Sequence, residues 1–227
     1  MAAQTFRAEF FADNGFQTWN PQWYGGHHLL SYSVLSPVAG GLLGVWLAGA
    51  IAAVLAAWAL TRAASAATDD RHVAIVASIL LSLGALAALW SGRTTYLMGV
   101  AAAAACLAAL MRGRAWYWWA PLAVLTALLS PVAALFLALL TFARLDREGI
   151  AVAALALVPV ATASIVWGDG GWQPYSWKAF VPVVIACVIA LLLVPRERKT
   201  LRIAVALYLL LNLGAFVLHT PIGSNAA

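Results

Sequence analysis

Residues 73 to 90 read VAIVASILLSLGALAALW and contain no charged side chain. An α-helix needs about 20 mainly apolar residues to cross the hydrocarbon core of a bilayer, so this stretch is predicted to span a membrane. Six further apolar runs flank it, covering approximately residues 37–60, 96–111, 116–142, 150–167, 180–194 and 203–218. The sequence therefore predicts an all-α fold, a polytopic transmembrane helix bundle.

The composition of the 227-residue chain agrees with this class. Hydrophobic residues make up 64% and charged residues 9%, and the mean hydropathy is +0.91, which no soluble domain of this size could bury. The net charge is +5, but the charges lie between apolar runs and form no patch, which excludes a nucleic acid as partner. Cys106 and Cys187 both fall inside apolar runs, so no disulfide framework is expected. Abundant alanine and the excess of arginine over lysine are typical of a high-GC bacterial genome.

The segment before the first apolar run is predicted to form a structured surface at the membrane. Residues 2–13 place phenylalanines at helical spacing and end at Asn14-Gly15, which indicates a short amphipathic helix on the interface. A frayed terminus is the alternative. Residues 14–36 then combine aromatic, glycine and histidine side chains, a composition typical of interfacial loops.

The first spanning helix is predicted to begin at Ser36-Pro37. Serine is a preferred N-cap residue and proline a preferred first helical residue, so the helix is expected to run from there to about Leu60. Its Gly40 and Gly44 have GxxxG spacing. Such spacing either permits close packing of another helix or arises by chance in an alanine- and glycine-rich segment.

The fourth apolar run, residues 116–142, decides the topology because Ser130-Pro131 interrupts it. If the run is one kinked helix, the basic residues divide almost evenly between the two sides of the membrane. If two half-helices turn back at Ser130-Pro131, ten of the 13 basic residues share one side, and Arg7, Arg93 and Lys178 lie on the other. Cytoplasmic loops carry excess Lys and Arg. The second arrangement, about six full spans plus a re-entrant pair, is therefore favoured.

In this topology the polar features gather on the outer face. Residues 1–36 form an outer helix and aromatic loop, residues 37–219 the bundle, and residues 220–227 an outer tail. Aromatic rings stack on sugars, so a surface that binds a sugar or a lipid headgroup is expected, with a plain interfacial belt as the alternative. The residues predicted to line it are Trp19, Trp23, Tyr24, His27, His28, Tyr32, Arg93 and His219.

The chemistry of this surface is weakly specified, because no nucleotide, metal or nucleophile motif is present. Asp13 is the best-placed outward acid and the candidate catalytic residue, although a carboxylate near a helix end is commonly solvated. Since His27 and His28 are adjacent, their side chains should diverge, which favours hydrogen bonding to an anionic or sugar ligand, or an interfacial role, over a shared metal. Arg93 is predicted either to hold an anion such as a phosphate or to snorkel toward headgroups. No cofactor is expected.

The pattern W-x-P-x-W-Y-G-G-H-x-x-x-x-Y-S-x-x-x-P, from Trp19 to Pro37, resembles a segment of GT-C type glycosyltransferase-like bacterial membrane proteins. In that family the segment leads from the first external loop into the second membrane helix. Residues 92–95, Ser130-Pro131 and residues 220–225 resemble further landmarks of the family. The resemblance implies a polytopic helical fold, a polyprenyl-phosphate-linked sugar donor, and sugar transfer on the outer face of the bacterial cytoplasmic membrane.

The chain departs from the family pattern in one respect. In the family, a spanning helix precedes the first external loop, which bears the catalytic carboxylate, whereas no apolar run precedes the loop here. A fragment that lacks the first transmembrane helix is therefore expected, and Asp13 does not simply take the family's role. Two other classes remain open. Broken helices such as that at Ser130-Pro131 form midplane sites in transporters and flippases, and alanine-rich packing also suits a non-catalytic membrane scaffold.

Overall fold

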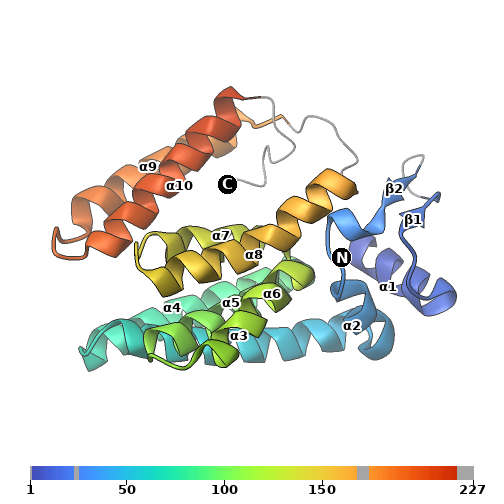
Figure 1. The fold of residues 1–227 in the computed structure, drawn as a ribbon, viewed down its shortest axis with the longest axis horizontal. Helices are drawn as coiled ribbons and strands as arrows, with labels where there is room; N and C mark the ends of the chain where they lie inside the picture. Colours follow the sequence, from blue (N-terminus) through green and yellow to red (C-terminus); the bar gives the residue numbers. More distant parts are fainter. Residues whose placement is uncertain (1, 23–25, 168–173, 219–227) are drawn as a thin grey trace.

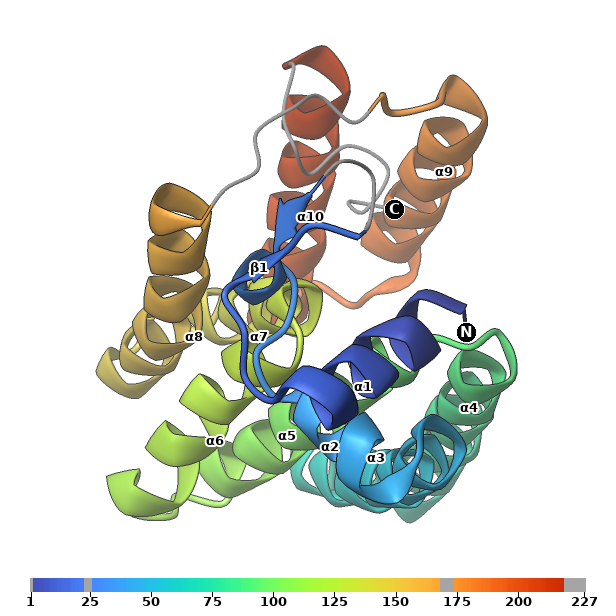
Figure 2. The ribbon, with the colours of Figure 1, turned by 90° about the vertical axis from the view of Figure 1, so that its right-hand side faces the viewer.

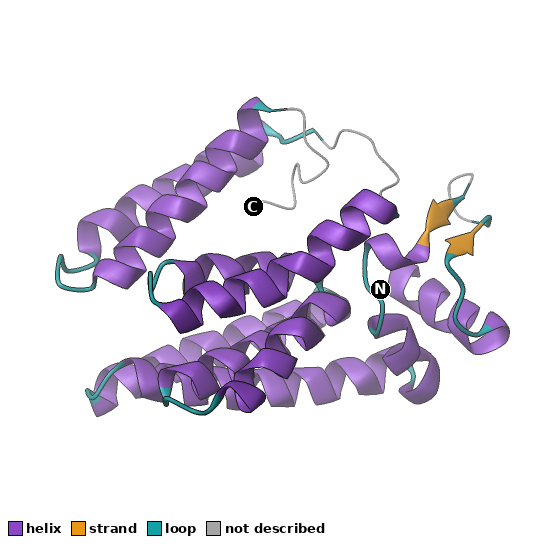
Figure 3. Cartoon of the chain, viewed as in Figure 1, coloured by secondary structure: helices purple, strands orange, loops and turns teal. Residues whose placement is uncertain are grey.

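The computed structural model describes residues 2–22, 26–167 and 174–218, and this part of the chain is almost entirely helical (Figures 1 and 3). In chain order its elements are α1 (Ala2–Asn14), β1 (Trp19–Asn20), β2 (His27–His28), the short 3-10 helix η1 (Leu29–Ser31), α2 (Ser36–Leu43), α3 (Val45–Ala67), α4 (Arg71–Trp90), α5 (Thr94–Met111), α6 (Trp116–Leu129), α7 (Pro131–Phe142), α8 (Arg147–Val166), α9 (Trp177–Leu193) and α10 (Lys199–Val217). The prediction of an all-α bundle is confirmed.

Five of the described helices are long and apolar enough to cross a bilayer, namely α3, α4, α5, α8 and α10. Helices α6, α7 and α9 are shorter but also apolar. Large apolar side chains are exposed along most of these helices. A water-soluble protein rarely exposes so much apolar surface, whereas a bilayer solvates it. The described part of the chain therefore has the architecture of a multi-pass membrane protein, as predicted.

Helices α3 to α8 run back and forth in antiparallel order (Figure 1). The turns that follow α3, α5, α7 and α9 lie together at the left-hand end of Figure 1. The opposite end carries α1, the β1–β2 hairpin, α2 and the turn between α4 and α5. Ten of the 13 lysines and arginines belong to the first end, which we call the basic end; the other is the polar end.

Helix α5 is the central helix of the bundle and packs against α3, α6 and α7. Eleven of its 18 residues are buried, and most of them are small. A Cβ atom added at Gly99 would lie 2.5 Å from the Cβ of Ser130 and 2.7 Å from the Cβ of Ala133, at the start of α7. Small side chains let membrane helices approach closely, so this glycine sets the separation of α5 and α7.

The chain reverses direction at Ser130, between α6 and α7. Leu137 and Ala138, late in α7, share a buried cluster with Trp119 and Ala123, early in α6, so α7 runs back alongside α6. The Ser130 hydroxyl caps α7 by accepting a hydrogen bond from the Ala133 amide at 3.3 Å. This reversal is the geometry that the re-entrant alternative expected for residues 116–142.

The last carbonyl groups of α6 accept hydrogen bonds from the segment that precedes α2. The amides of Val34 and Leu35 donate to the Leu128 carbonyl at 2.9 and 3.1 Å, and the Ser33 hydroxyl donates to the Leu129 carbonyl at 2.7 Å. A helix that ends within a membrane needs such partners, because no water reaches its last carbonyls. The segment before α2 therefore supports the break at Ser130.

The prediction of a single helix from Ser36 to about Leu60 is wrong. Helix α2 ends at Leu43, and Gly44 adopts φ 78° before α3 begins. Only glycine adopts this backbone conformation without strain, so Gly44 breaks the helix and does not form a GxxxG contact. Ser36 is also not the N-cap, because it is already the first residue of α2 and Leu35 is the N-cap. Gly40, in contrast, does permit close packing, since an added Cβ would lie 2.9 Å from the Cβ of Ala8 in α1.

Helices α9 and α10 form a hairpin that packs on the rest mainly through α7 (Figure 1). The buried Tyr175 hydroxyl donates to Asn212 Oδ1 at 2.6 Å, and the Phe180 and Phe216 rings stack at 4.2 Å. Burial raises the pKa of Tyr175, which keeps its hydroxyl a donor. At the polar end, α9 and α10 are therefore held together by a hydrogen bond and by packed aromatic rings.

Candidate functional site: an arginine, histidine and aromatic cluster

The aromatic loop is built on a two-residue antiparallel hairpin in which Trp19 pairs with His28, and Asn20 with His27. Successive residues of a strand point to opposite faces, so the two histidines diverge, as the sequence predicted. The Trp19 and His28 rings meet edge to face at 4.8 Å between centroids. Gly26 adopts φ 106° and has no space for a Cβ, because the Trp19 indole lies against it. The hairpin therefore presents Trp19 on one face and His27 on the other.

His27 meets Arg7, which comes from helix α1. One terminal nitrogen of the Arg7 guanidinium lies 3.4 Å from His27 Nε2, and the guanidinium carbon lies 4.5 Å from the centre of the Tyr32 ring. A guanidinium over a ring face at this distance is a cation–π contact. Helix α1 lies across the end of the bundle (Figure 2), which brings residues 20 and 25 positions apart together. We call Arg7, His27 and Tyr32 the Arg7 cluster.

The contact with Arg7 determines which ring nitrogen carries the hydrogen when His27 is neutral. A guanidinium is only a donor, so Nε2 accepts and Nδ1 carries the hydrogen. His27 Nδ1 is buried and has no hydrogen-bond partner among the described residues. A buried donor without a partner is destabilising, and such groups are found where a ligand or a water molecule completes the bond. The Arg7 cluster thus offers a cation and an adjacent N–H donor.

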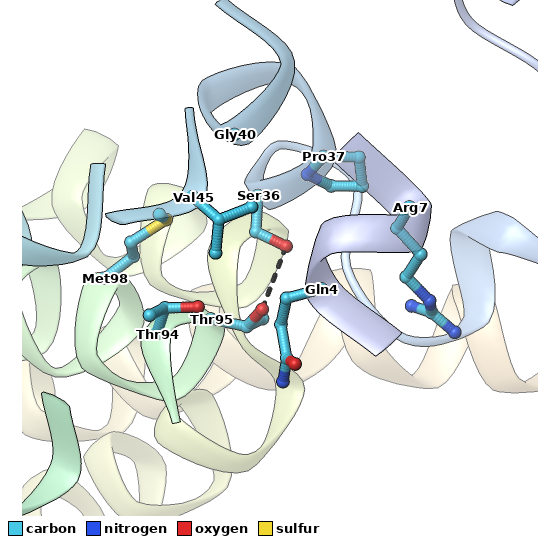
Figure 4. A pocket seen from close by; sticks show the side chains of 9 residues that line it. All are labelled: Gln4, Arg7, Ser36, Pro37, Gly40, Val45, Thr94, Thr95 and Met98. Atoms are coloured by element: carbon cyan, nitrogen blue, oxygen red, sulfur yellow. Dashed lines mark hydrogen bonds between the residues drawn. The ribbon is translucent and has the colours of Figure 1, made fainter. Parts of the chain in front are cut away.

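A small polar cavity lies between α1, α2 and α5, where α1 packs on the bundle. Figure 4 shows Gln4 pointing toward Ser36 and Thr95, whose hydroxyls form a 3.2 Å hydrogen bond, while Arg7 points away from that pair. The cavity measures about 10 Å³. That is the space of one water molecule, so the cavity is too small for a substrate. Its lining residues belong to the interface that holds α1 on the bundle.

The structure brings together only some of the predicted site residues. Trp19, His27, His28 and Tyr32 lie in or beside the Arg7 cluster. Trp23, Tyr24 and His219 fall outside the described residues.

Two further predicted residues lie apart from the cluster. Asp13 is exposed near the end of α1, and the structure shows no contact between its carboxylate and the cluster. Arg93 is exposed at the start of α5, and no described hydrogen bond or ion pair joins it to the cluster.

Arg7 is the one residue of the cluster that the sequence did not indicate as a candidate site residue. In the sequence it contributes only a charge to the topology, because it lies on a separate helix 20 residues before His27. One signal could have found it. Phe6 and Phe10 are four residues apart and mark an apolar face of the helix, and Arg7 is next to that face.

The described residues contain no group of three or more His, Cys, Asp or Glu side chains able to hold a metal ion. No family model matches the chain, and no curated protein or solved structure matches it either. Chemically, the Arg7 cluster combines a cation, an N–H donor and an aromatic face. This combination binds an anion next to a ring-shaped group.

Proposed function

We propose that this protein is a GT-C-like glycosyltransferase of the bacterial cytoplasmic membrane whose outer face binds a polyprenyl-phosphate-linked sugar. The Arg7 cluster carries this proposal. Arg7 and the Nδ1 hydrogen of His27 hold the phosphate, and the exposed Tyr32 ring beside Arg7 offers an aromatic surface for the sugar. Bidentate, charge-assisted bonds make arginine well suited to a phosphate group.

The orientation follows from the distribution of basic residues. With the basic end in the cytoplasm, ten of the 13 lysines and arginines lie inside, as membrane proteins prefer. Helices α3, α4, α5, α8, α9 and α10 then cross the bilayer, and α6 and α7 form a re-entrant pair that turns at Ser130. The Arg7 cluster lies at the polar end and therefore faces outward.

Sugar transfer also needs a group that accepts the proton of the acceptor. Asp13 lies on the same helix as Arg7 and remains a prediction for that role, since its carboxylate is exposed and unconstrained. The Arg7 cluster itself accounts for binding of the donor, not for the proton transfer.

The test is binding of a polyprenyl-phosphate-linked hexose to the purified full chain in detergent, followed by an assay of hexose transfer in vesicles. Arg7→Ala should weaken binding by about tenfold or more, because charge-assisted hydrogen bonds contribute about 1.5–3 kcal/mol. His27→Ala should weaken it less. Arg147→Ala, an exposed arginine at the basic end, is the matched control and should leave binding unchanged. Equal binding by the Arg7→Ala variant would contradict the proposal.

A transporter or flippase is the second candidate, favoured by the reversal at Ser130. Paired half-helices of this kind form midplane binding sites in secondary transporters. Transbilayer movement of the labelled lipid without transfer of the hexose would favour this candidate. Transfer without movement would favour the glycosyltransferase.

A further inference from the structure

A long groove runs between α3 and α6 and over α5, from the residues of α2 toward the basic end. Helices α3 and α6 each pack against α5 and form no packed interface with one another. The groove consists of two adjoining hollows of about 350 and 310 Å³, which share Trp58, Ala105 and Leu122. Volumes of this size are typical of ligand sites.

The floor of the groove is made of alanines of α5, and its walls are large apolar side chains. The floor residues are Ala101, Ala102, Ala105, Ala108 and Ala109. Leu55 and Trp58 of α3 face Leu122 and Leu125 of α6 across them. Methyl side chains leave the space that leucines would fill, so the α5 sequence itself opens the groove.

Three arginines stand at the basic end of the groove, Arg62, Arg112 and Arg114. The Arg112 guanidinium donates to the Arg62 carbonyl at 2.8 Å and to the Ser65 hydroxyl at 3.1 Å, which fixes it beside the mouth. The Arg62 guanidinium carbon lies 5.7 Å from the Trp58 ring centre. None of the three forms an ion pair with a described carboxylate, whereas Arg144, at the same end, pairs with Asp146 at 2.6 Å. The mouth of the groove therefore has positive charge with no protein counterion in the described chain.

The length of the groove selects one class of occupant. Its floor extends from Met98 to Ala109 on α5, which is about 16 Å at 1.5 Å per residue. One leaflet of a bilayer has about 15 Å of hydrocarbon. An acyl chain of one leaflet fits this length when its headgroup lies at the arginines, whereas a polyprenyl chain is much longer.

We propose that this groove binds one anionic phospholipid of the cytoplasmic leaflet. Its phosphate lies among Arg62, Arg112 and Arg114, and one acyl chain lies along the alanine floor. Basic pockets between membrane helices on the cytoplasmic side recognise anionic headgroups in this way. The site is separate from the Arg7 cluster and does not depend on the glycosyltransferase proposal.

The test uses tryptophan fluorescence of the purified full chain in detergent, titrated with phospholipids brominated on their acyl chains. Trp58 and Trp118 line the groove and report a chain that enters it. Brominated phosphatidylglycerol should quench at a mole fraction lower by about tenfold or more than brominated phosphatidylcholine, which has the same chains and a zwitterionic headgroup. The preference should shrink by about fivefold for each arginine removed, since one basic residue near an anionic membrane surface contributes about 1 kcal/mol.

The double variant Arg62→Gln and Arg114→Gln tests the headgroup, because no described hydrogen bond of the fold uses either guanidinium. Its matched control is Arg147→Gln with Arg196→Gln, which removes the same charge from exposed positions outside the groove. Only the first double variant should lose the preference for phosphatidylglycerol. Equal loss in both would reduce the effect to net charge and overturn the proposal.

The acyl chain is tested by Ala105→Phe, which fills the centre of the groove. Its control is Ala87→Phe on the exposed face of α4. The groove variant should lose the phosphatidylglycerol-specific quenching and the control should keep it. Equal quenching by the two lipids in the unaltered protein would overturn the proposal. So would displacement of phosphatidylglycerol by a polyprenyl phosphate at a much lower mole fraction, because the groove would then belong to the longer chain.

Discussion

Helices α4 and α5 are consecutive, of similar length, and both apolar enough to span a membrane, yet they have opposite environments. Of the 20 residues of α4 only Ala85 is buried, whereas α5 buries 11 of 18. The buried helix is the less apolar of the two. In a bilayer, lipid solvates leucine as well as the protein interior does, so small side chains and close packing decide which helix becomes central.

The largest test of this difference replaces matched glycines by leucine. Gly99→Leu should destabilise the protein by about 3 kcal/mol or more, because Ser130 and Ala133 stand 2.5 and 2.7 Å from the added Cβ and cannot move without displacing α7. Gly84→Leu, on α4, meets nothing within 4 Å and should be neutral or slightly stabilising. The measurement is the unfolding midpoint of each variant in one detergent. Similar midpoints for the two variants would contradict the central position of α5.

A second, smaller test removes a leucine from each helix. Leu97 is 1% exposed, and Leu80 is 63% exposed. Leu97→Ala should cost about 2–3 kcal/mol, near the lower end of values for buried leucines. In a bilayer the leucine is not transferred from water, so only the cost of the cavity remains. Leu80→Ala should change stability by less than about 0.5 kcal/mol. Unfolding of both variants by sodium dodecyl sulfate would measure the difference, and equal losses would show that α4 is also covered by protein.

The sequence predicted both helices but not their different environments. Apolar runs fix where a helix can exist, so residues 73–90 and 96–111 were found from their composition alone. Burial depends on which neighbours approach, and no run contains that information by itself. The break at Ser130-Pro131 was visible because a serine followed by proline is a helix-start signal. Proline alone is not sufficient, since Pro121, Pro159 and Pro182 lie inside helices. The break at Gly44 was not visible, since glycine occurs in many unbroken membrane helices.

In the candidate site, too, the residues of one short segment could be predicted, whereas a contact from a distant segment could not. Trp19, His27, His28 and Tyr32 lie in one short segment, and their composition indicated a binding surface. Arg7 joins them only because α1 folds across the end of the bundle, with Ala8 against Gly40. A contact between a helix and a later loop has no local signature. Sequence reasoning therefore found the aromatic part of the surface and missed its cation.

A third test compares two serines. The Ser130 hydroxyl caps α7 where α7 meets α5, and Ser130→Ala should cost about 1 kcal/mol. The Ser78 hydroxyl donates to the Ala74 carbonyl of its own helix α4 at 2.7 Å. Such a bond within one turn adds little to helix stability, so Ser78→Ala should be close to neutral. Thermal midpoints of the two variants measured side by side give the difference. A larger loss at Ser78 than at Ser130 would argue against a structural role for the cap.

The smallest test concerns the two aspartates that cap α8 and α4. Asp146 accepts from the Gly149 amide at 2.6 Å and from the Arg144 guanidinium, and the hydrogen bond from Arg144 holds the pKa of Asp146 below its ordinary value of 3.8. A carboxyl whose pKa is lower in the folded state stabilises the fold at pH values above 3.8, and that contribution disappears as the pH falls through its folded pKa. Asp70 accepts from the His72 and Val73 amides and forms no ion pair with a described residue.

Asparagine can still cap a helix but cannot pair with arginine, so Asp146→Asn isolates the ion pair from the cap. The pair is partly exposed, and its loss should cost less than about 1 kcal/mol at pH 7 and a smaller amount at pH 2, where more of the carboxyl is protonated. Asp70→Asn is the matched control, because it keeps the cap on α4 and removes no described ion pair. The difference between the variants' unfolding midpoints at the two pH values is the measurement. If Asp146→Asn lowered stability equally at pH 2 and pH 7, the carboxylate would act through the cap alone, and Arg144 would be free to serve, like Arg112, an anion at the basic end.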